Sequence, residues 1–499
     1  MSHSARLDRC VLILIVAIYV VLGVQYARLT PPWQAPDEPA HFNYVRTVAE
    51  QGRLPILQPG DYPFTYLEQI KAQRFPPEMS IDPIRYEAWQ PPLYYLAAAV
   101  PYRLGMALGW SQGQLLLALR LLSVVLGAAL LVVAYRVIRI LAPAQIGLAL
   151  GTTALAAAVP MHIAMTAAVN NDTLAELLGA IVLWLLLVRL QWPQAPAAQW
   201  AWLGIVLGLA GLAKLSTGAL VPLVLAALIY LAWQQPTGKR ARYLATRLAA
   251  VALPAALLLA PWVAHNIAVY GLGDPLVMRR HDAVVVGQVR TADWLAKVGP
   301  LHGALEFATT TFHSFWGQFG WMGVPIDDRI YRFLLILTGL ALLGLALRLR
   351  DGPRIWGRLS SVQRVGLVLL AGSVLMTATV YIAYNVTFEQ HQGRYLFPAL
   401  IACSFFLTLG WREITRRAWR LIIAGLLIVC AVLLAARRLV TPEPLDKYTL
   451  AAVTALAGAF GLGALVPESW AELLYILPYP MLLVLDVACL YLFILPALR

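Results

Sequence analysis

The chain has 499 residues, of which 60% are hydrophobic and 13% are charged. Soluble domains carry about a quarter charged residues, and many runs here reach the roughly 20 apolar residues that span a bilayer. The composition therefore excludes an ordinary soluble domain and predicts an all-α polytopic integral membrane protein. Alternating strand-length segments typical of a membrane β-barrel are not seen.

The formal net charge of +13 does not indicate a nucleic-acid partner. The basic residues lie in short clusters between apolar runs, a pattern that reflects membrane topology and contact with anionic lipid headgroups. Cys10, Cys403, Cys430 and Cys489 fall inside apolar runs without paired spacing. We therefore expect core cysteines and neither a disulfide framework nor a zinc site.

The first apolar run follows Arg6 and Arg9 and lacks a convincing cleavage site, so we expect an uncleaved anchor with a cytoplasmic N-terminus. A long mixed segment, 29–114, comes next and contains a helix led by Pro91 and Pro92. If that helix does not cross the membrane, inner segments carry 18 Lys and Arg residues and short outer loops carry 5. If it crosses, the balance becomes 7 inside and 16 outside. The positive-inside rule favours the first arrangement.

This arrangement predicts one integrated membrane domain (1–499) with about 13 spans. Two large outer loops are expected at 29–114 and 265–329, and the proline-led helix lies on or dips into the outer surface. The spans are expected near 11–28, 115–137, 146–168, 174–188, 200–213, 217–233, 248–264, 330–347, 365–384, 395–410, 421–436, 450–466 and 473–495.

The first outer motif, Pro-Asp-Glu-Pro-Ala-His-Phe (36–42), places two adjacent acids at the start of a short amphipathic helix. One interpretation is that Asp37 simply caps that helix. A cap needs one acid, so we instead expect Asp37 to be a catalytic base, with Glu38 orienting the site or binding a cation. His41 is expected to contact substrate. The apolar stripe predicts a helix lying on the bilayer, where poor solvation raises the basicity of a carboxylate.

Other outer-face residues have two interpretations each. Glu87 and Gln90 precede the proline-led helix as interfacial anchors or as substrate contacts. Asp172 lies in a tight turn, either as a helix cap or as a second acid facing Asp37. Lys214 lies between two short spans and either snorkels or binds a phosphate, because an ammonium at membrane depth needs a partner.

The motif Gln-His-Gln-Gly-Arg-Tyr (390–395) precedes a span on its outer side. Arg394 is well placed there to hold a phosphate bidentately, with His391 and Tyr395 as neighbouring substrate contacts. Ordinary headgroup anchoring is the alternative. Asp486 in the last span is either functional or faces a neighbouring helix. The sequence shows no metal-spaced His/Cys cluster, so no resident cofactor is predicted, and a divalent metal is left open.

In this order and on one side, the motifs resemble those of the GT-C superfamily of polyprenyl-phosphate-dependent glycosyltransferases. The resemblance is closest to the branch of protein O-mannosyltransferases and lipid A aminoarabinose transferases. The segments 36–42, 314–321 (Ser-Phe-Trp-Gly-Gln-Phe-Gly-Trp) and 392–398 (Gln-Gly-Arg-Tyr-Leu-Phe-Pro) are also similar to a set of largely uncharacterised bacterial membrane proteins placed in that superfamily. The similarity covers most of the chain up to about Pro398.

The resemblance implies an inverting hexosyl- or pentosyltransferase that moves a sugar from a polyprenyl-phosphate donor to a glycan, lipid or protein hydroxyl. The reaction would take place on the outer face of the cytoplasmic membrane. Asp37 would take the acceptor proton, and Arg394 and Lys214 would stabilise the departing phosphate. No Asp-x-Asp motif supports a divalent metal. A transporter or flippase of lipid-linked sugars is the alternative, although transporters usually show repeat symmetry.

Overall fold

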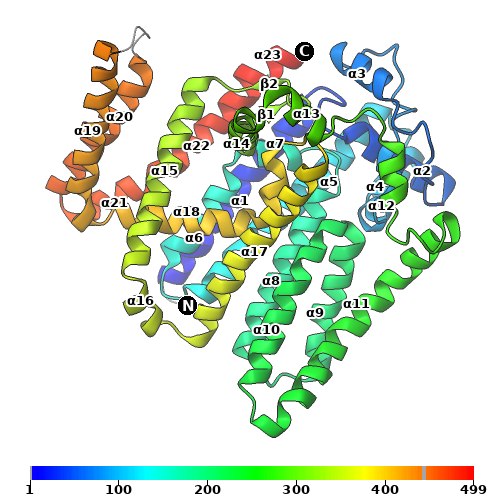
Figure 1. The fold of residues 1–499 in the computed structure, drawn as a ribbon, viewed down its shortest axis with the longest axis horizontal. Helices are drawn as coiled ribbons and strands as arrows, with labels where there is room; N and C mark the ends of the chain where they lie inside the picture. The colour runs from blue at the N-terminus through cyan, green and yellow to red at the C-terminus, as the bar shows by residue number, and fades with distance from the viewer. Residues whose placement is uncertain (1–2, 441–445) are drawn as a thin grey trace.

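The computed structural model describes residues 3–440 and 446–499, which are almost entirely helical (Figure 1). One two-stranded antiparallel sheet in these residues pairs β1 (Gln318–Phe319) with β2 (Val324–Pro325). The helices in chain order are α1 (His3–Leu29), α2 (Glu38–Gln51), α3 (Phe64–Ala72), η1 (Tyr86–Trp89), α4 (Leu93–Ala107), α5 (Gln112–Leu141), α6 (Ile146–Ala157), α7 (Pro160–Thr166), α8 (Asp172–Gln191), α9 (Ala197–Ala213), η2 (Leu215–Leu220), α10 (Val221–Trp233), η3 (Thr237–Lys239), α11 (Arg240–Tyr270), α12 (Met278–Val284), α13 (Thr291–Val298), α14 (Pro300–Trp316), α15 (Asp328–Arg350), α16 (Gly352–Arg358), α17 (Ser361–Thr387), η4 (Gly393–Ala399), α18 (Leu400–Ile414), α19 (Arg417–Val440), α20 (Lys447–Leu465), α21 (Glu468–Ile476), α22 (Pro478–Ala488), η5 (Cys489–Ile494) and α23 (Leu495–Leu498).

The described residues contain eleven helices long and apolar enough to cross a membrane, or twelve if α6 and α7 form one bent span. The apolar helix α9, at the predicted span 200–213, has 17 residues and is not among these candidates, so the structure supports 11 or 12 of the about 13 predicted spans. The protein is therefore a multi-pass membrane protein, as its composition predicts. The proline-led helix, α4, has only 15 residues and is not among the candidate spans, in agreement with the prediction that it does not cross.

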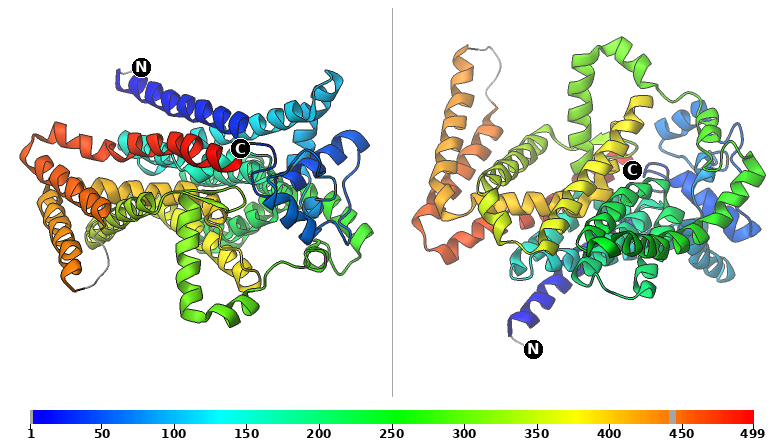
Figure 2. Two further views of the ribbon diagram at one scale, coloured as in Figure 1. Left: turned by 90° about the horizontal axis from the view of Figure 1, so that it is seen from above. Right: turned by 60° about the horizontal axis from the view of Figure 1, so that its bottom comes forward.

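The two large loops meet at one end of the helices. In Figure 1, α2, α3, α13 and the small sheet lie toward the top, whereas the N-terminal end of α1 and α16 lie toward the bottom. The Trp321 indole N–H donates to the carbonyl of Trp33 at 2.9 Å, and the Leu57 N–H donates to the Tyr270 hydroxyl at 2.8 Å. These bonds join segments far apart in sequence, so the motifs of both loops share one side. The hairpin of α19 and α20 stands at the opposite edge in both views of Figure 2.

Two breaks in the helices bring polar groups toward this end. Between α6 and α7 the axis bends by 66°, and Pro160 is the first residue of α7. Proline lacks the N–H that a continuous helix would need and clashes with the preceding turn. Between α9 and η2, Lys214 alone is extended, with φ −161°. The break at Lys214 therefore places non-helical backbone beside the site described below, and the bend at Pro160 directs α7 toward the segment that bonds to Glu38.

The helix α2 is enclosed by protein, contrary to the expectation that its apolar stripe lies on the bilayer. Phe42 and Val45 are fully buried, and the polar His41 is buried with them. The covering residues are tyrosines of η1 and α4 and leucines of α5, which form one core with α2. The helix ends at Gly52, which has the left-handed φ of 64° that glycine adopts readily.

The helices α15 and α18 pack with their backbones in close contact. A Cβ atom built on Gly344 would collide with the carbonyl of Gly410, and one built on Gly410 would collide with the carbonyl of Ala341. Backbone atoms cannot move aside as a flexible side chain can. Small residues are therefore required at this contact, as is common where membrane helices approach closely.

We predict that Gly344→Ala destabilises the protein by about 1–3 kcal/mol, because overpacking forces the two helices apart. The matched control is Gly339→Ala on the same helix, where an added Cβ meets no atom within 4 Å. That control is expected to be neutral or to stabilise the protein by up to about 1 kcal/mol, the difference in helix propensity between Gly and Ala. Apparent melting temperatures in lipid discs measure both effects. Equal melting temperatures for the two variants would refute the packing interpretation.

Candidate active site

Asp37 lies in the turn between α1 and α2, where its backbone is left-handed with φ 66°. Its side chain occupies the N-cap position but makes no capping hydrogen bond, so the simple cap interpretation is wrong. Instead, Oδ1 accepts from the Tyr86 hydroxyl at 2.7 Å and Oδ2 accepts from the Arg394 guanidinium at 2.6 Å. A left-handed aspartate is uncommon and costs energy. The surrounding contacts hold this conformation, which directs the carboxylate toward Arg394.

Arg394 owes its position to a close approach of η4 to α14. Gly393 permits this approach, because a Cβ there would collide with backbone atoms of α14. The Gly393 N–H donates to the Ser314 hydroxyl at 2.7 Å, and Gln392 Oε1 accepts from Arg394 Nε at 2.7 Å. The three residues of the Gln-Gly-Arg motif therefore have different roles. The glutamine orients the arginine, the glycine allows the backbones to pack closely, and the arginine supplies the charge that meets Asp37.

A second ion pair joins Asp172, the first residue of α8, to Lys214 at the break after α9. The Lys214 Nζ and Asp172 Oδ1 are 2.5 Å apart, and the side chains are 19% and 27% exposed. The extended backbone of Lys214 directs its side chain toward the start of α8. The lysine therefore has a carboxylate partner and does not simply snorkel. Asp172 follows the N-cap residue Asn171, so it is not itself the cap.

Glu87 and Gln90 lie at η1 and connect the first outer loop to the second ion pair. Gln90 Nε2 donates to Glu87 Oε2 at 2.8 Å, and Gln90 Oε1 accepts from Asn171 Nδ2 at 3.2 Å. Burial raises the pKa of Glu87 to about 7; the charge of Asp37 adds to this effect, and Lys214 opposes it. Near neutral pH, Glu87 therefore exchanges readily between its protonated and ionised forms.

His41 lies among these charges. Its Nδ1 is 2.8 Å from the Tyr95 hydroxyl. Burial lowers the pKa of His41 to about 4, and all four members of the two ion pairs act on the ring electrostatically. The imidazole is therefore neutral at pH 7 and acts as a hydrogen-bonding group there. This shared influence also shows that the two ion pairs belong to one charge cluster.

The pKa of Asp37 reflects opposing effects. Burial alone would raise it, but the charge of Arg394 and the hydrogen bonds from Arg394 and Tyr86 outweigh burial and lower it. Asp37 is thus ionised at neutral pH in the free protein. In this state Arg394 stabilises the carboxylate, and Tyr86 fixes its orientation.

Glu38, although adjacent to Asp37, faces a different partner. It is fully buried, and Arg120 donates to Oε1 at 2.7 Å and to Oε2 at 2.6 Å. The backbone N–H groups of Trp33 and Val169 add bonds of 3.1 Å each. Arg120 also donates to three carbonyls in the last turn of α1 and the turn after it. The geometry thus places Glu38 in a closed buried network that ties α1, α2 and α5 together.

The two remaining predicted residues lie on either side of the Arg394 motif. The Tyr395 ring lies 5.2 Å from the Arg394 guanidinium, within range of a cation–π contact. His391 instead packs edge-on against Trp294 and Phe307, with centroid distances of 4.6 and 5.1 Å. The predicted residues that the structure brings together around the charge cluster are Asp37, His41, Glu87, Gln90, Asp172, Lys214, Arg394 and Tyr395.

Two residues of the site, Arg120 and Tyr86, are not predicted from the sequence. Arg120 had a usable signal, because an arginine inside a predicted span requires a buried partner. Tyr86 had none, since tyrosine is common at membrane interfaces. In the part of the chain that the structure describes, no three His, Cys, Asp or Glu side chains gather closely enough to hold a metal ion. The carboxylates of Asp37 and Asp172 are each balanced by a basic side chain.

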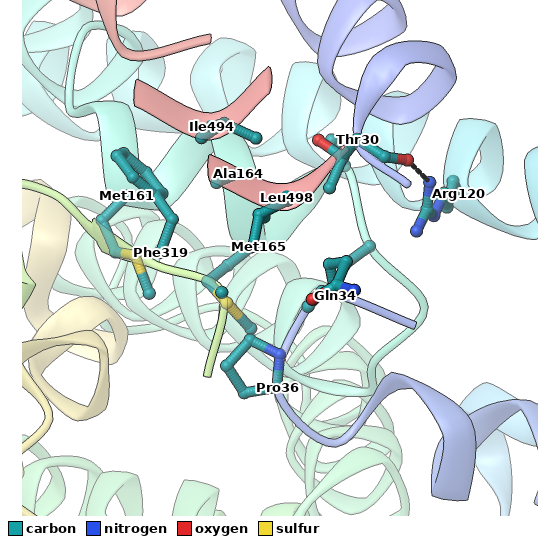
Figure 3. Close-up of a pocket in the computed structure, with 14 residues that line it drawn as sticks. Thr30, Gln34, Pro36, Arg120, Met161, Ala164, Met165, Phe319, Ile494 and Leu498 are labelled. Carbon is teal, nitrogen blue, oxygen red and sulfur yellow. Dashed lines mark hydrogen bonds between the residues drawn. The ribbon is translucent and has the colours of Figure 1, made fainter. Parts of the chain in front are cut away.

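Apolar cavities flank the charge cluster on two sides. One, of about 390 Å³ counting its open side, lies between α7, β1, α23 and the turn before α2 (Figure 3). Met165 projects between Leu498 and Pro36 in this view, and its sulfur also approaches Arg394 to 4.0 Å. The other, of about 480 Å³, begins at Asp172 and lies between α8, η2, α17 and η4. Both offer apolar space beside the paired charges.

The segment 85–403 matches the family described as Predicted membrane protein (DUF2142). The match covers more than half of the chain, so the protein belongs to this family. Glu87, Asp172, Lys214 and Arg394 lie within the matched segment, whereas Asp37 precedes it. No curated protein matches the sequence.

Two solved membrane proteins share the fold. ArnT from Cupriavidus metallidurans, bound to undecaprenyl phosphate, is 17% identical with a TM-score of 0.51, and the alignment covers 97% of this chain and 76% of ArnT. The Archaeoglobus fulgidus oligosaccharyltransferase, tethered with an acceptor peptide, is 12% identical with a TM-score of 0.50 over 96% of this chain. The present chain spans 55% of that protein. At these identities the likeness establishes the fold, which is GT-C-like as predicted.

We predict that Glu38→Gln lowers the free energy of unfolding by about 3–5 kcal/mol, because it leaves the buried Arg120 without a counter-charge. Asp37→Asn is the matched neighbour. Its loss should be smaller, since the Asp37 side chain is 25% exposed and water can reach it. Apparent melting temperatures in lipid discs compare the two variants. If Asp37→Asn proved the more damaging, the assignment of Glu38 to a structural network would be wrong.

Proposed function

We propose that this protein is an inverting glycosyltransferase that moves a sugar from a polyprenyl-phosphate donor to an acceptor hydroxyl on the outer face of the cytoplasmic membrane. The observation that carries the proposal is the convergence of two ion pairs, Asp37–Arg394 and Asp172–Lys214, in one charge cluster. Such a transfer needs a base for the acceptor and cations for the leaving phosphate. The GT-C-like fold supports the same assignment.

Arg394 and Lys214 are the proposed phosphate ligands. Both already hold carboxylate oxygens, and phosphate oxygens have similar charge and hydrogen-bonding geometry. A donor phosphate can therefore replace a carboxylate on each cation without leaving the cation unpaired. The planar guanidinium of Arg394 suits two phosphate oxygens at once.

Donor binding would convert Asp37 into a stronger base. Arg394 is the group that lowers the pKa of Asp37 most strongly in the free protein. When Arg394 turns to the phosphate, Asp37 loses this counter-charge and gains a neighbouring anion, and both changes raise its pKa. Tyr86 would keep the carboxylate oriented during the exchange. Proton removal would thus become effective only when the donor is present.

In the proposed step, the acceptor oxygen forms a bond to the anomeric carbon while the bond from that carbon to the phosphate oxygen breaks. The acceptor proton moves to Asp37, and the lipid phosphate leaves with the bonding electrons. Attack from the face opposite the phosphate inverts the configuration. Arg394 and Lys214 offset the charge that grows on the phosphate through an oxocarbenium-like transition state. Asp37 therefore acts at the bond that forms, and the two cations act at the bond that breaks.

The principal test is release of polyprenyl phosphate by the purified protein in lipid discs. The donors would be a panel of polyprenyl-phosphate pentoses and hexoses, with membrane extract as acceptor. We expect Asp37→Asn to reduce turnover at least about 100-fold, the usual lower bound for loss of a general base, while donor affinity is kept or rises because Arg394 loses a competing carboxylate. The matched control is Asp82→Asn, since Asp82 lies in the same loop and pairs with Arg46 at the surface.

Full turnover in Asp37→Asn would show that another group removes the proton. Donor binding without release, in wild type and variant alike, would direct attention to the transporter alternative. Vesicles loaded with the bound donor then decide the question. Translocation without cleavage of the sugar–phosphate bond would replace the transferase proposal.

We also expect donor affinity to depend on pH through Glu87. Its pKa of about 7 means that it gains a negative charge as pH rises through neutrality. The donor phosphodiester is an anion throughout this range, so the ionised Glu87 repels it. Donor affinity should therefore be greatest below pH 7 and weaken above it, by at most about tenfold per pH unit for one linked proton. Glu87→Gln should remove this dependence. A wild-type affinity that is constant between pH 6 and pH 8.5 would contradict the prediction.

A further inference from the structure

A water-facing cleft separates the two outer loops on the far side of η1. Its volume is about 1160 Å³ counting its open side, more than twice that of either apolar cavity beside the charge cluster. Segments 56–59 and 269–280 supply its walls. The Tyr270 hydroxyl accepts from the Leu57 N–H at 2.8 Å, and Arg280 Nε donates to the Leu57 carbonyl at 3.1 Å. These bonds hold the walls together, so the cleft has a defined shape.

Two adjacent arginines, Arg279 and Arg280, line this cleft. Asp274, the acid beside them, accepts from their backbone N–H groups at 3.1 and 2.7 Å and thereby fixes the turn before α12. Within residues 3–440 and 446–499, neither guanidinium forms an ion pair. Three other arginines of these loops have carboxylate partners: Arg46 with Asp82, Arg85 with Asp61, and Arg290 with Asp282. Arg53 and Arg103 instead bond to neutral oxygens. The cleft therefore holds positive charge that the protein does not neutralise with a carboxylate contact.

The short helix η1 links the cleft to Asp37. The helix η1 has four residues, so at about 2.0 Å per residue it spans only about 8 Å. At one end, Tyr86 donates to Asp37. At the other end, the Trp89 ring packs on His281, next to Arg280, at 4.6 Å. Helix η1 therefore contacts both the charge cluster and the helix that carries Arg279 and Arg280.

We propose that this cleft binds the acceptor and that the acceptor is an anionic glycan, carrying carboxylate or phosphate groups. The role of the glycan as acceptor rests on the proposed transferase function, whereas the binding of an anionic glycan to the cleft does not. Arginine guanidinium groups match carboxylate and phosphate geometry bidentately. Gln58 and Tyr270 add an amide and an aromatic ring suited to sugar hydroxyls and sugar faces. An open cleft of this kind admits a chain from the aqueous side, whereas the donor lipid approaches from the membrane.

The experiment measures binding of defined oligosaccharides to the full-length protein in discs of neutral phosphatidylcholine, with no donor present. The probes are tetragalacturonate, a phosphorylated mannotetraose and neutral maltotetraose. Arg279→Gln is the informative variant, since the Arg279 side chain lines the cleft without an ion-pair partner. The matched control is Arg53→Gln, because Arg53 is an exposed arginine of the first outer loop that bonds only to the Gln51 side chain in the described residues.

We expect at least one anionic probe to bind saturably and at least about tenfold more tightly than the neutral one, with affinity falling as salt rises. Arg279→Gln should weaken that binding about tenfold, Arg279→Glu more, and Arg53→Gln not at all. The anionic probe that binds identifies the carboxylate or the phosphate as the recognised group. Equal affinity for the neutral probe, or unchanged binding in Arg279→Glu, would overturn the proposal.

Turnover is measured separately, so the two proposals can fail independently. Polyprenyl phosphate release that persists while no anionic glycan binds would leave the transferase proposal standing and refute the anionic acceptor. Anionic binding that depends on Arg279, without release from any donor, would retain the cleft as a glycan site and count against the transferase.

Discussion

The buried contact between Glu38 and Arg120 positions the candidate site. Glu38 is the first residue of α2, and Arg120 also grips the end of α1, so the turn between these helices is pinned to α5. Asp37 is part of that pinned turn and has a left-handed backbone that a free chain would seldom adopt. Glu38 thus has a structural role, because it fixes the turn that orients the Asp37 carboxylate. Of these two adjacent residues, Glu38 stabilises the turn and Asp37 is the candidate for chemistry.

The charge cluster is built from complementary pairs. Asp37 meets Arg394 and Asp172 meets Lys214, so the site has little net charge before any ligand arrives. An isolated charge in this partly buried site would cost free energy, because desolvation disfavours the charged form. Pairing removes most of that cost and keeps both cations ready for a phosphate. In the free protein, Asp37 and Asp172 thus occupy the cations that the donor phosphate would bind, and they are also candidates for chemistry.

Much of the fold follows from apolar periodicity and the distribution of basic residues, which predict the spans, the non-crossing α4 and the common side of the polar motifs. The pairing of side chains does not follow from them. Glu38 and its partner Arg120 are 82 residues apart in the sequence, and Asp37 and Arg394 are 357 apart. Only the tertiary packing determines which acid pairs with which arginine. The burial of α2 was likewise hidden, because an amphipathic stripe fits a protein core as well as a bilayer. His391 looks like a site residue by its neighbours in sequence, yet aromatic packing draws its ring away from the charge cluster.

The pairing of Asp37 with Arg394 has a consequence for the charge balance of the proposed transfer. A sugar phosphodiester enters as a monoanion, and the lipid phosphate that leaves carries one additional negative charge. Asp37 loses one negative charge in the same step when it takes the acceptor proton. The total charge enclosed by the site is then the same before and after bond transfer, so no ion has to enter from water while the sugar moves. Protons need to exchange with solvent only after the products separate, which divides the cycle into a transfer step that conserves charge and a recovery step that returns the proton to water.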